Sequence, residues 1–133
     1  MDGQDHAVPE SRLLKAVGHG NVLAADCPSR GVLDHLTSRW GVLVMIMLER
    51  GTLRFSAIRR GIGGVSERML AQTLKQLECD GLVLRQAFDV VPPHVEYSLT
   101  PMGREAAGHV RRLTDWVEMN IGAVMEHRAT GGR

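Results

Sequence analysis

The sequence predicts a mainly α-helical domain that carries one small β-hairpin, an α+β fold. The first observation is a series of apolar side chains between residues 32 and 77 that recur every three or four positions, as on amphipathic helices. The second is a pair of short segments, 82–88 and 94–99, which contain β-branched and aromatic residues and flank a loop with two prolines. The third is Thr100-Pro101, a helix start that precedes a long apolar stripe. We therefore expect helices on both sides of the hairpin.

The chain length fits one domain with short tails. Its 133 residues lie within the usual size of about 100 to 150 residues for a single domain. Residues 1–22 mix Gly, His, Asp and Pro around one short apolar patch, so we expect a partly ordered N-terminal tail there. We expect the domain itself over residues 23–127, with its last helix at 101–127, and a C-terminal tail over 128–133.

The apolar runs and the N-terminal residues predict a protein that neither spans a membrane nor is secreted. Hydrophobic residues make up 44% of the chain and charged residues 23%, as in ordinary globular proteins. The longest apolar run, residues 42–48, is far shorter than the roughly 20 residues of a membrane-spanning helix. The N-terminus also lacks the pattern of a secretory signal. We therefore expect a cytoplasmic protein with no membrane partner.

The ionisable residues indicate neither a metal site nor a catalytic centre. Two cysteines are too few for a disulfide scaffold and lack zinc-ligand spacing, and the six histidines show no ligand spacing either. The sequence contains no glycine-rich phosphate loop between a strand and a helix. We expect no cofactor and no enzyme activity. Because the net charge is only +1, nucleic-acid binding would depend on where the sixteen basic residues lie.

Capping residues and apolar spacing place four helices before the hairpin. Asp26 and Pro28 are the predicted start of the first helix. Ser38 is the predicted cap of the second helix, which is apolar enough to be largely buried. A third, very short helix is expected over residues 55–61. A glycine-rich turn then leads to Ser66, the predicted cap of a longer fourth helix that ends near residue 79.

The fourth helix, residues 66–79, has two faces of different chemistry. Three leucines repeat at helical spacing on one side, and polar residues repeat at a similar spacing on the other. Taken alone, a polar face of this kind is typical of an ordinary solvated helix. The order of the elements around this helix is what favours a binding function. The apolar face comprises Leu70, Leu74 and Leu77, and the polar face comprises Arg68, Gln72 and Lys75.

The order of short helix, turn, polar-faced helix and hairpin is the topology of a winged helix-turn-helix. In that fold the second helix of the motif enters the major groove of DNA. Arg can form a fork to guanine, Gln can do the same with adenine, and basic groups on flanking elements bind phosphates. We therefore expect double-stranded DNA as a partner. The candidate DNA-binding residues are Arg54, Ser56, Arg59, Arg60, Ser66, Glu67, Arg68, Gln72, Lys75, Arg85 and His94.

The last helix, residues 101–127, carries an apolar stripe close to a heptad repeat. Such a stripe permits a homodimer, and the alternative is that it packs only on its own domain. Three glycines weaken the helix by roughly 1 kcal/mol each, so it needs support from the domain or from a partner. The candidate interface residues are Val110, Leu113, Trp116, Val117 and Ile121.

Separate short motifs follow one another over about residues 25–118. They are Cys27-Pro28, Trp40, Arg54-Phe55-Ser56, Ile58-Arg59-Arg60, Ser66-Glu67-Arg68-Met69-Leu70, Asp80-Gly81-Leu82-Val83, Val91-Pro92-Pro93-His94-Val95-Glu96-Tyr97-Ser98-Leu99-Thr100, Gly103 and Trp116. In this order they resemble the HxlR-type family of bacterial transcriptional regulators. The resemblance implies a homodimer joined through terminal helices that binds an inverted-repeat operator and represses or activates transcription. The chain departs from the family at residues 37–41, where Thr-Ser-Arg-Trp-Gly replaces a usual Gly-Gly-Lys-Trp-Thr.

Cys27 is the candidate redox-sensing residue. It precedes Pro28 at a predicted helix start, where unpaired backbone N–H groups and the helix dipole favour a thiolate. The resemblance implies that a cysteine at this position senses oxidants or electrophiles in some relatives. The alternative is that Cys27 is simply a small buried hydrophobe. An oxidant or a small molecule is therefore the expected effector, if the protein has one.

Two other functions fit the same fold. A winged-helix module that binds another protein and not DNA would have a neutral or apolar outer face on helix 66–79. A regulator that senses a small ligand would have a pocket between the core and the dimer helix, with Trp40 and Trp116 as its aromatic lining. The alternative, which we favour, is that both tryptophans are core or dimer-interface residues. The basic outer face of helix 66–79 favours DNA over the first alternative.

Overall fold

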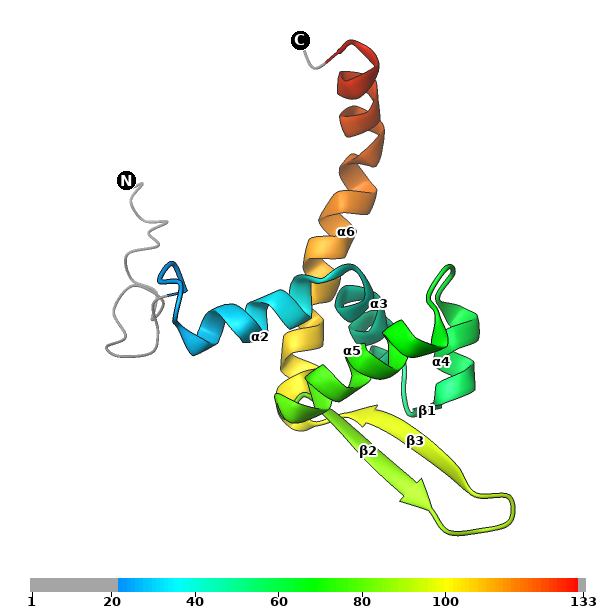
Figure 1. Ribbon diagram of the computed structural model, residues 1–133. Helices are drawn as coiled ribbons and strands as arrows, with labels where there is room; N and C mark the ends of the chain where they lie inside the picture. Colours follow the sequence, from blue (N-terminus) through cyan, green and yellow to red (C-terminus); the bar gives the residue numbers. More distant parts are fainter. Residues whose placement is uncertain (1–21, 132–133) are drawn as a thin grey trace.

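The computed structural model describes residues 22–131, and its helices and strands follow the predicted order (Figure 1). The expected tail at 1–22 therefore lies outside the described residues, except for Val22. The elements are α2 (Pro28–Thr37), α3 (Arg39–Glu49), β1 (Leu53–Arg54), α4 (Phe55–Gly61), α5 (Glu67–Cys79), β2 (Val83–Phe88), β3 (His94–Leu99) and α6 (Pro101–Ala129).

The predicted capping residues of three helices are confirmed. Ser38 accepts a hydrogen bond from the N–H of Gly41 at the start of α3, and Ser66 accepts one from the N–H of Met69 at the start of α5. Thr100 caps α6 in the same way. Each cap satisfies a backbone N–H that has no partner inside its helix.

Two predicted helix boundaries differ from the structure. Asp26 does not cap α2, because Pro28 occupies the first helical turn and places Cys27 at the N-cap position. Helix α6 ends at Ala129 rather than at residue 127. Gly131, two residues after the last helical residue, has a φ of 80°, the left-handed conformation that commonly follows a helix. The stop signal therefore lies further along the chain than predicted.

Strands β2 and β3 form the hairpin, here called the wing. Together with β1 they make a three-stranded antiparallel sheet with the order β1-β3-β2. The sequence predicts β2 and β3, and β2 begins at Val83 rather than at residue 82. Strand β1 was not predicted, because two residues are too few to show the alternation of a strand. Its register sets Leu53 opposite Tyr97 and Arg54 opposite Glu96.

The core lies among α3, α4, α5 and the base of the hairpin. Three predicted core leucines of α5 are buried there, and α3 is largely buried as expected. The largest fully buried side chains are Met45, Leu48, Ile58, Leu70, Leu74, Leu77 and Val44. This core holds α5 with one face inward and one face outward.

Helix α6 is divided into two parts with different surroundings. Its first ten residues pack on α3 and β3 and bury Gly103, Ala107 and Val110. From residue 111 onward no residue of the helix is buried, and Figure 1 shows this part standing clear of the domain. The predicted stripe is therefore not one continuous seam, because Val110 belongs to the core of its own domain.

No single helix within residues 22–131 combines the length and the hydropathy of a membrane span. Helices α2 and α3 reach that hydropathy only together, and the chain bends by 71° between them.

Candidate nucleic-acid interface

Helix α5 presents a polar face to solvent. Arg68, Gln72 and Lys75 are exposed, while Leu70, Leu74 and Leu77 on the other side are buried. The predicted division of the helix into two faces is confirmed. At its N-terminus the hydroxyl oxygen of Ser66 caps the helix, and its O–H remains a donor that a phosphate oxygen can accept from.

Helix α4 and the turn after it bring further candidate residues to the start of α5. Ile58 is buried and anchors α4, so that Arg59 and Arg60 beside it are exposed. The turn requires Gly64, whose φ of 85° is one that other residues rarely adopt. A surface hollow of about 400 Å³ is lined by Phe55, Ser56, Arg59, Arg60 and Glu67. Four predicted candidates from two elements therefore meet in one place.

A second hollow, of about 210 Å³, lies between α5 and the wing. It brings together Lys75 and Arg85, two predicted phosphate-binding residues from different elements. Tyr97 lines it because it lies directly opposite Arg85 in the sheet register, on the same face. Glu78 also lines it and was not predicted, although its position three residues after Lys75 places it on the same side of the helix.

The structure does not bring Arg54 and His94 to the same face of the wing as Arg85. Side chains alternate between the two faces of a sheet, and the register places Arg54, Gln86 and Glu96 on the face opposite to Arg85. His94 lies on that opposite face too. Its Nε2 is 3.1 Å from Oε2 of Glu96, and its ring stacks on Phe88 at a centroid distance of 4.9 Å.

The basic candidates are not neutralised by their own domain. Within residues 22–131, none of them except His94 forms an ion pair with a carboxylate. In contrast, Arg111 on α6 binds Glu49. Cations without a carboxylate partner keep their full charge for an anion such as phosphate. The unpaired basic residues are Arg54, Arg59, Arg60, Arg68, Lys75 and Arg85.

Cys27 lies at the start of α2, as predicted, where it occupies the N-cap position, and it is only 9% exposed. Its backbone is fixed from both sides, because its N–H donates to Ala24 and its carbonyl accepts from the N–H of Arg30. Cys79, at the end of α5, is exposed. Among the described residues there is no group of three or more His, Cys, Asp or Glu side chains that could hold a metal ion.

A regulator that senses a small ligand was expected to have an aromatic pocket between the core and the dimer helix. The hollow between α3 and α6 has a mainly charged lining instead. It has a volume of about 420 Å³ and is lined by Ile46, Glu49, Arg50, Arg111, Thr114 and Asp115. Trp40 packs against the core instead, and Trp116 lines a groove along α6 itself.

Helix, turn, outward-facing helix and hairpin define a winged helix-turn-helix protein, and the comparisons agree. The model of the HxlR-like helix-turn-helix family matches residues 35–125, so the chain belongs to that family. The chain is a transcriptional regulator of the helix-turn-helix type.

Relatives of known name and structure support the same classification. The HTH-type transcriptional regulator YtfH of Escherichia coli (strain K12) is 55% identical over 116 residues, 87% of this chain and 92% of YtfH. The structure of the transcriptional regulator ytfH from Salmonella typhimurium is also 55% identical, with a TM-score of 0.79 over 82% of this chain and 97% of that one. The redox regulator HypR in its reduced form is 34% identical, with a TM-score of 0.68 over 74% of this chain and 98% of HypR.

Proposed function

We propose that the protein acts in the cytoplasm as a homodimer that binds an inverted-repeat operator through α5 and thereby represses or activates transcription. The observation that carries this proposal is the outer face of α5, where Arg68, Gln72 and Lys75 are exposed and neither cation forms an ion pair within residues 22–131. We further propose that modification of the Cys27 thiol switches DNA binding. The domain that does this covers residues 23–127, together with the last two residues of α6.

Base recognition is assigned to the first half of α5. Arg68 has the fork geometry for guanine O6 and N7, and Gln72, one turn further, suits adenine N6 and N7. The carboxylate of Glu67 can accept only from a donor such as cytosine N4 and repels phosphate, so it disfavours binding where no such donor is present. The three side chains together would select a short base sequence.

Phosphate contacts are assigned to the two hollows that flank this half of α5. In the hollow at the N-terminal end, Arg59 and Arg60 outnumber the one carboxylate, Glu67, and Ser56 adds a hydroxyl donor. In the hollow at the wing, Lys75 and Arg85 likewise outnumber Glu78. Phosphate contacts fix the orientation of a protein on DNA without reading sequence. Arg54 and His94 remain candidates for contacts from the other face of the wing.

A second copy of the chain is the proposed partner of residues 111–129, here called the outer part of α6. None of the apolar residues there is buried within residues 22–131: Leu113 is 56% exposed and Trp116 is 58% exposed. Val117, Ile121 and Val124 continue the same face. A long helix with an uncovered apolar stripe is the geometry of a helix pair between protomers. Val110 would contribute little to that interface, because it is already buried in its own domain.

The burial of Cys27 explains how a thiol reaction would change the protein. At 9% exposure the sulfur has little free space around it, so an added group or a disulfide would displace the start of α2. HypR, which shares this fold, is described as a redox regulator and has both reduced and oxidized structures. That likeness supports oxidation as the signal, with a small-molecule electrophile as the second candidate.

The test is a titration of the purified protein against DNA from upstream of its own gene and against unrelated DNA of equal length. Both titrations are run near physiological salt, with reductant and then with a mild oxidant. Sequence-selective binding is the expected result, and specific sites are typically bound about 10³-fold or more tightly than unrelated DNA. Equal, weak binding to both DNAs and to a randomised library would contradict DNA recognition and favour the protein-interaction module.

A further inference from the structure

Helix α2 is held to the domain by few contacts. None of its ten residues is buried, and it packs on α3 and on α5 near its C-terminal end. Leu36 touches the core from this end. Two other apolar residues of α2, Val32 and Leu33, line an apolar surface hollow. The position of α2 therefore depends on a small number of specific contacts.

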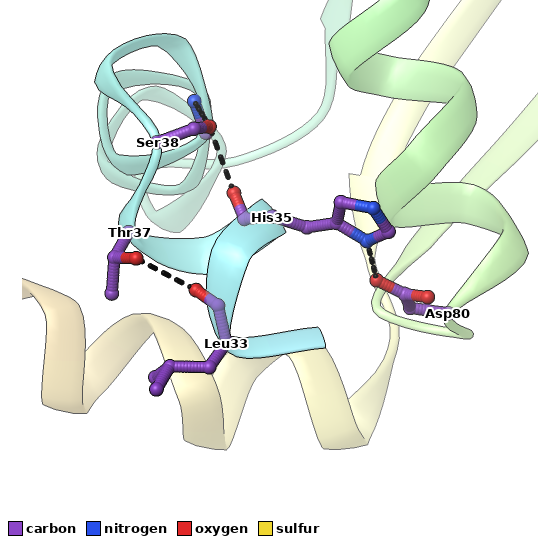
Figure 2. A network of polar contacts seen from close by, with 6 residues as sticks. Leu33, His35, Thr37, Ser38 and Asp80 are labelled. Atoms are coloured by element: carbon purple, nitrogen blue, oxygen red, sulfur yellow. Dashed lines mark hydrogen bonds and ion pairs between the residues drawn. The ribbon is translucent and has the colours of Figure 1, made fainter. Parts of the chain in front are cut away.

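One of these contacts joins α2 directly to the end of α5. The Nδ1 of His35 lies 2.6 Å from Oδ2 of Asp80, and the two side chains are 28% and 14% exposed. Figure 2 shows the imidazole of His35 reaching from α2 to the carboxylate at the last turn of the neighbouring helix. Because a carboxylate oxygen accepts, the ring nitrogen is the donor.

Each partner of this pair is fixed at its own end. Asp80 is the C-cap of α5, and its N–H donates to the carbonyl of Gln76. The carbonyl of His35 accepts from the hydroxyl of Ser38, which at the same time caps α3 (Figure 2). The contact therefore ties the corner between α2 and α3 to the C-terminal end of the helix that carries Arg68 and Gln72.

We propose that His35 is a positioning residue for DNA recognition, which acts through Asp80 to hold α5 at the orientation in which its outer face fits the major groove. This inference rests on the proposed DNA-binding function. The contact between His35 and Asp80 also couples α2 to α5. A reaction at Cys27, at the other end of α2, would displace α2 and with it His35, the residue that holds the end of α5. Because base contacts carry the sequence selectivity and phosphate contacts do not, a change in the orientation of α5 is expected to weaken binding to the operator more than binding to unrelated DNA.

The test compares three variants with a matched control. His35→Leu removes the donor, whereas His35→Asn keeps an N–H donor close to the place of Nδ1. Asp80→Asn removes the acceptor charge. Asp34→Asn is the control, because it makes the same change at an exposed neighbour on α2. Dissociation constants are measured for the operator and for unrelated DNA, together with the thermal midpoint of each variant.

His35→Leu is expected to raise the operator dissociation constant about threefold to tenfold, the size typical of one coupled contact, and to change the constant for unrelated DNA less than twofold. His35→Asn should recover most of the loss, and Asp34→Asn should behave as wild type. The proposal is overturned if His35→Leu binds the operator as wild type does, or if both constants rise by the same factor along with a lower thermal midpoint. If His35→Leu does not fold, Asp80→Asn relative to Asp34→Asn decides by the same criteria.

A second readout without DNA separates this inference from the proposed function. Hydrogen exchange is measured at the amides of Asp80, Gly81 and Leu82, which donate to carbonyls of the last turn of α5. Faster exchange in His35→Leu and recovery in His35→Asn support the positioning contact even if the wild-type protein shows no operator preference. Unchanged exchange in His35→Leu refutes it even if DNA binding is confirmed.

Discussion

Gly103 packs its backbone directly against the backbone of Leu82. A Cβ added at Gly103 would overlap the carbonyl oxygen of Leu82, which also accepts the N–H of Thr100 at 3.1 Å. The start of α6 and the start of β2 therefore meet at a distance that only glycine permits. The sequence indicated Gly103 as a weak point of the helix and as part of the family resemblance, and the structure shows that its lack of a side chain is required.

The first prediction concerns two glycines of α6. Gly103→Ala is expected to destabilise the protein by about 1 to 3 kcal/mol, because the new methyl group meets backbone that cannot move aside cheaply. Gly122→Ala, with nothing within 4 Å of its added Cβ, is expected to stabilise it by up to about 1 kcal/mol. Urea denaturation of both variants at equal protein concentration measures the difference. Equal effects of the two substitutions would contradict the close packing.

The second prediction concerns base recognition by Arg68. Arg68→Ala is expected to lower operator affinity by about 1 to 3 kcal/mol and to relax the choice at one base pair, because a fork to guanine is lost. Arg112→Ala, an exposed arginine on the outer part of α6, is the control and should keep the wild-type preference. Selection from a randomised operator library gives the measurement. An unchanged base preference in Arg68→Ala would remove that residue from recognition.

The third prediction concerns phosphate binding by Lys75. Lys75→Ala is expected to weaken binding to operator and unrelated DNA by a similar factor, because a phosphate contact carries no sequence information. The slope of log affinity against log salt concentration should fall in magnitude by about 1. Titrations at four salt concentrations measure it, with Gln76→Ala on the same helix as the uncharged control. A slope equal to that of wild type would exclude the contact.

The fourth prediction concerns the thiol switch. A mild oxidant is expected to change the operator affinity of the wild-type protein and to leave Cys27→Ser unaffected, because the serine hydroxyl does not undergo thiol oxidation. Cys79→Ser is the control and should respond as wild type. Titrations before and after oxidation, with mass spectrometry of the modified residue, give the measurement. Equal responses of wild type and Cys27→Ser would place the switch elsewhere.

The fifth prediction concerns the outer part of α6. Leu113→Glu is expected to convert a dimer to a monomer and to weaken operator binding strongly, because it buries a charge in an apolar interface. Met119→Glu, which introduces the same group at an 84% exposed position away from the stripe, should leave the dimer intact. Sedimentation equilibrium distinguishes the two. A wild-type protein that is monomeric throughout would contradict the interface.

Local signals were enough to predict most of the fold. Ser38, Ser66 and Thr100 act as caps because a hydroxyl before an apolar period satisfies the first backbone N–H groups, and this depends on nearby residues alone. The outer face of α5 follows from helical spacing in the same way. These features need no knowledge of distant parts of the chain.

Pairing between distant segments could not be predicted. Whether Arg54 shares a face with Arg85 depends on the register of β1 and β2 on β3, and a shift of one residue would reverse the answer. The contact of His35 with Asp80 joins residues 45 positions apart, and no local pattern indicates it. The division of the α6 stripe at Val110 likewise depends on where the domain surface ends.

The outer part of α6 links folding to the amount of protein present. Beyond Arg111, which binds Glu49 through Nε at 3.0 and 3.1 Å, no residue of the helix is buried, and helices in proteins draw most of their stability from tertiary packing. If its stripe is completed by a second copy, helical order in this segment rises with concentration. Operator occupancy then varies with the square of the regulator concentration while monomers predominate, so a twofold change in synthesis produces up to a fourfold change in occupancy.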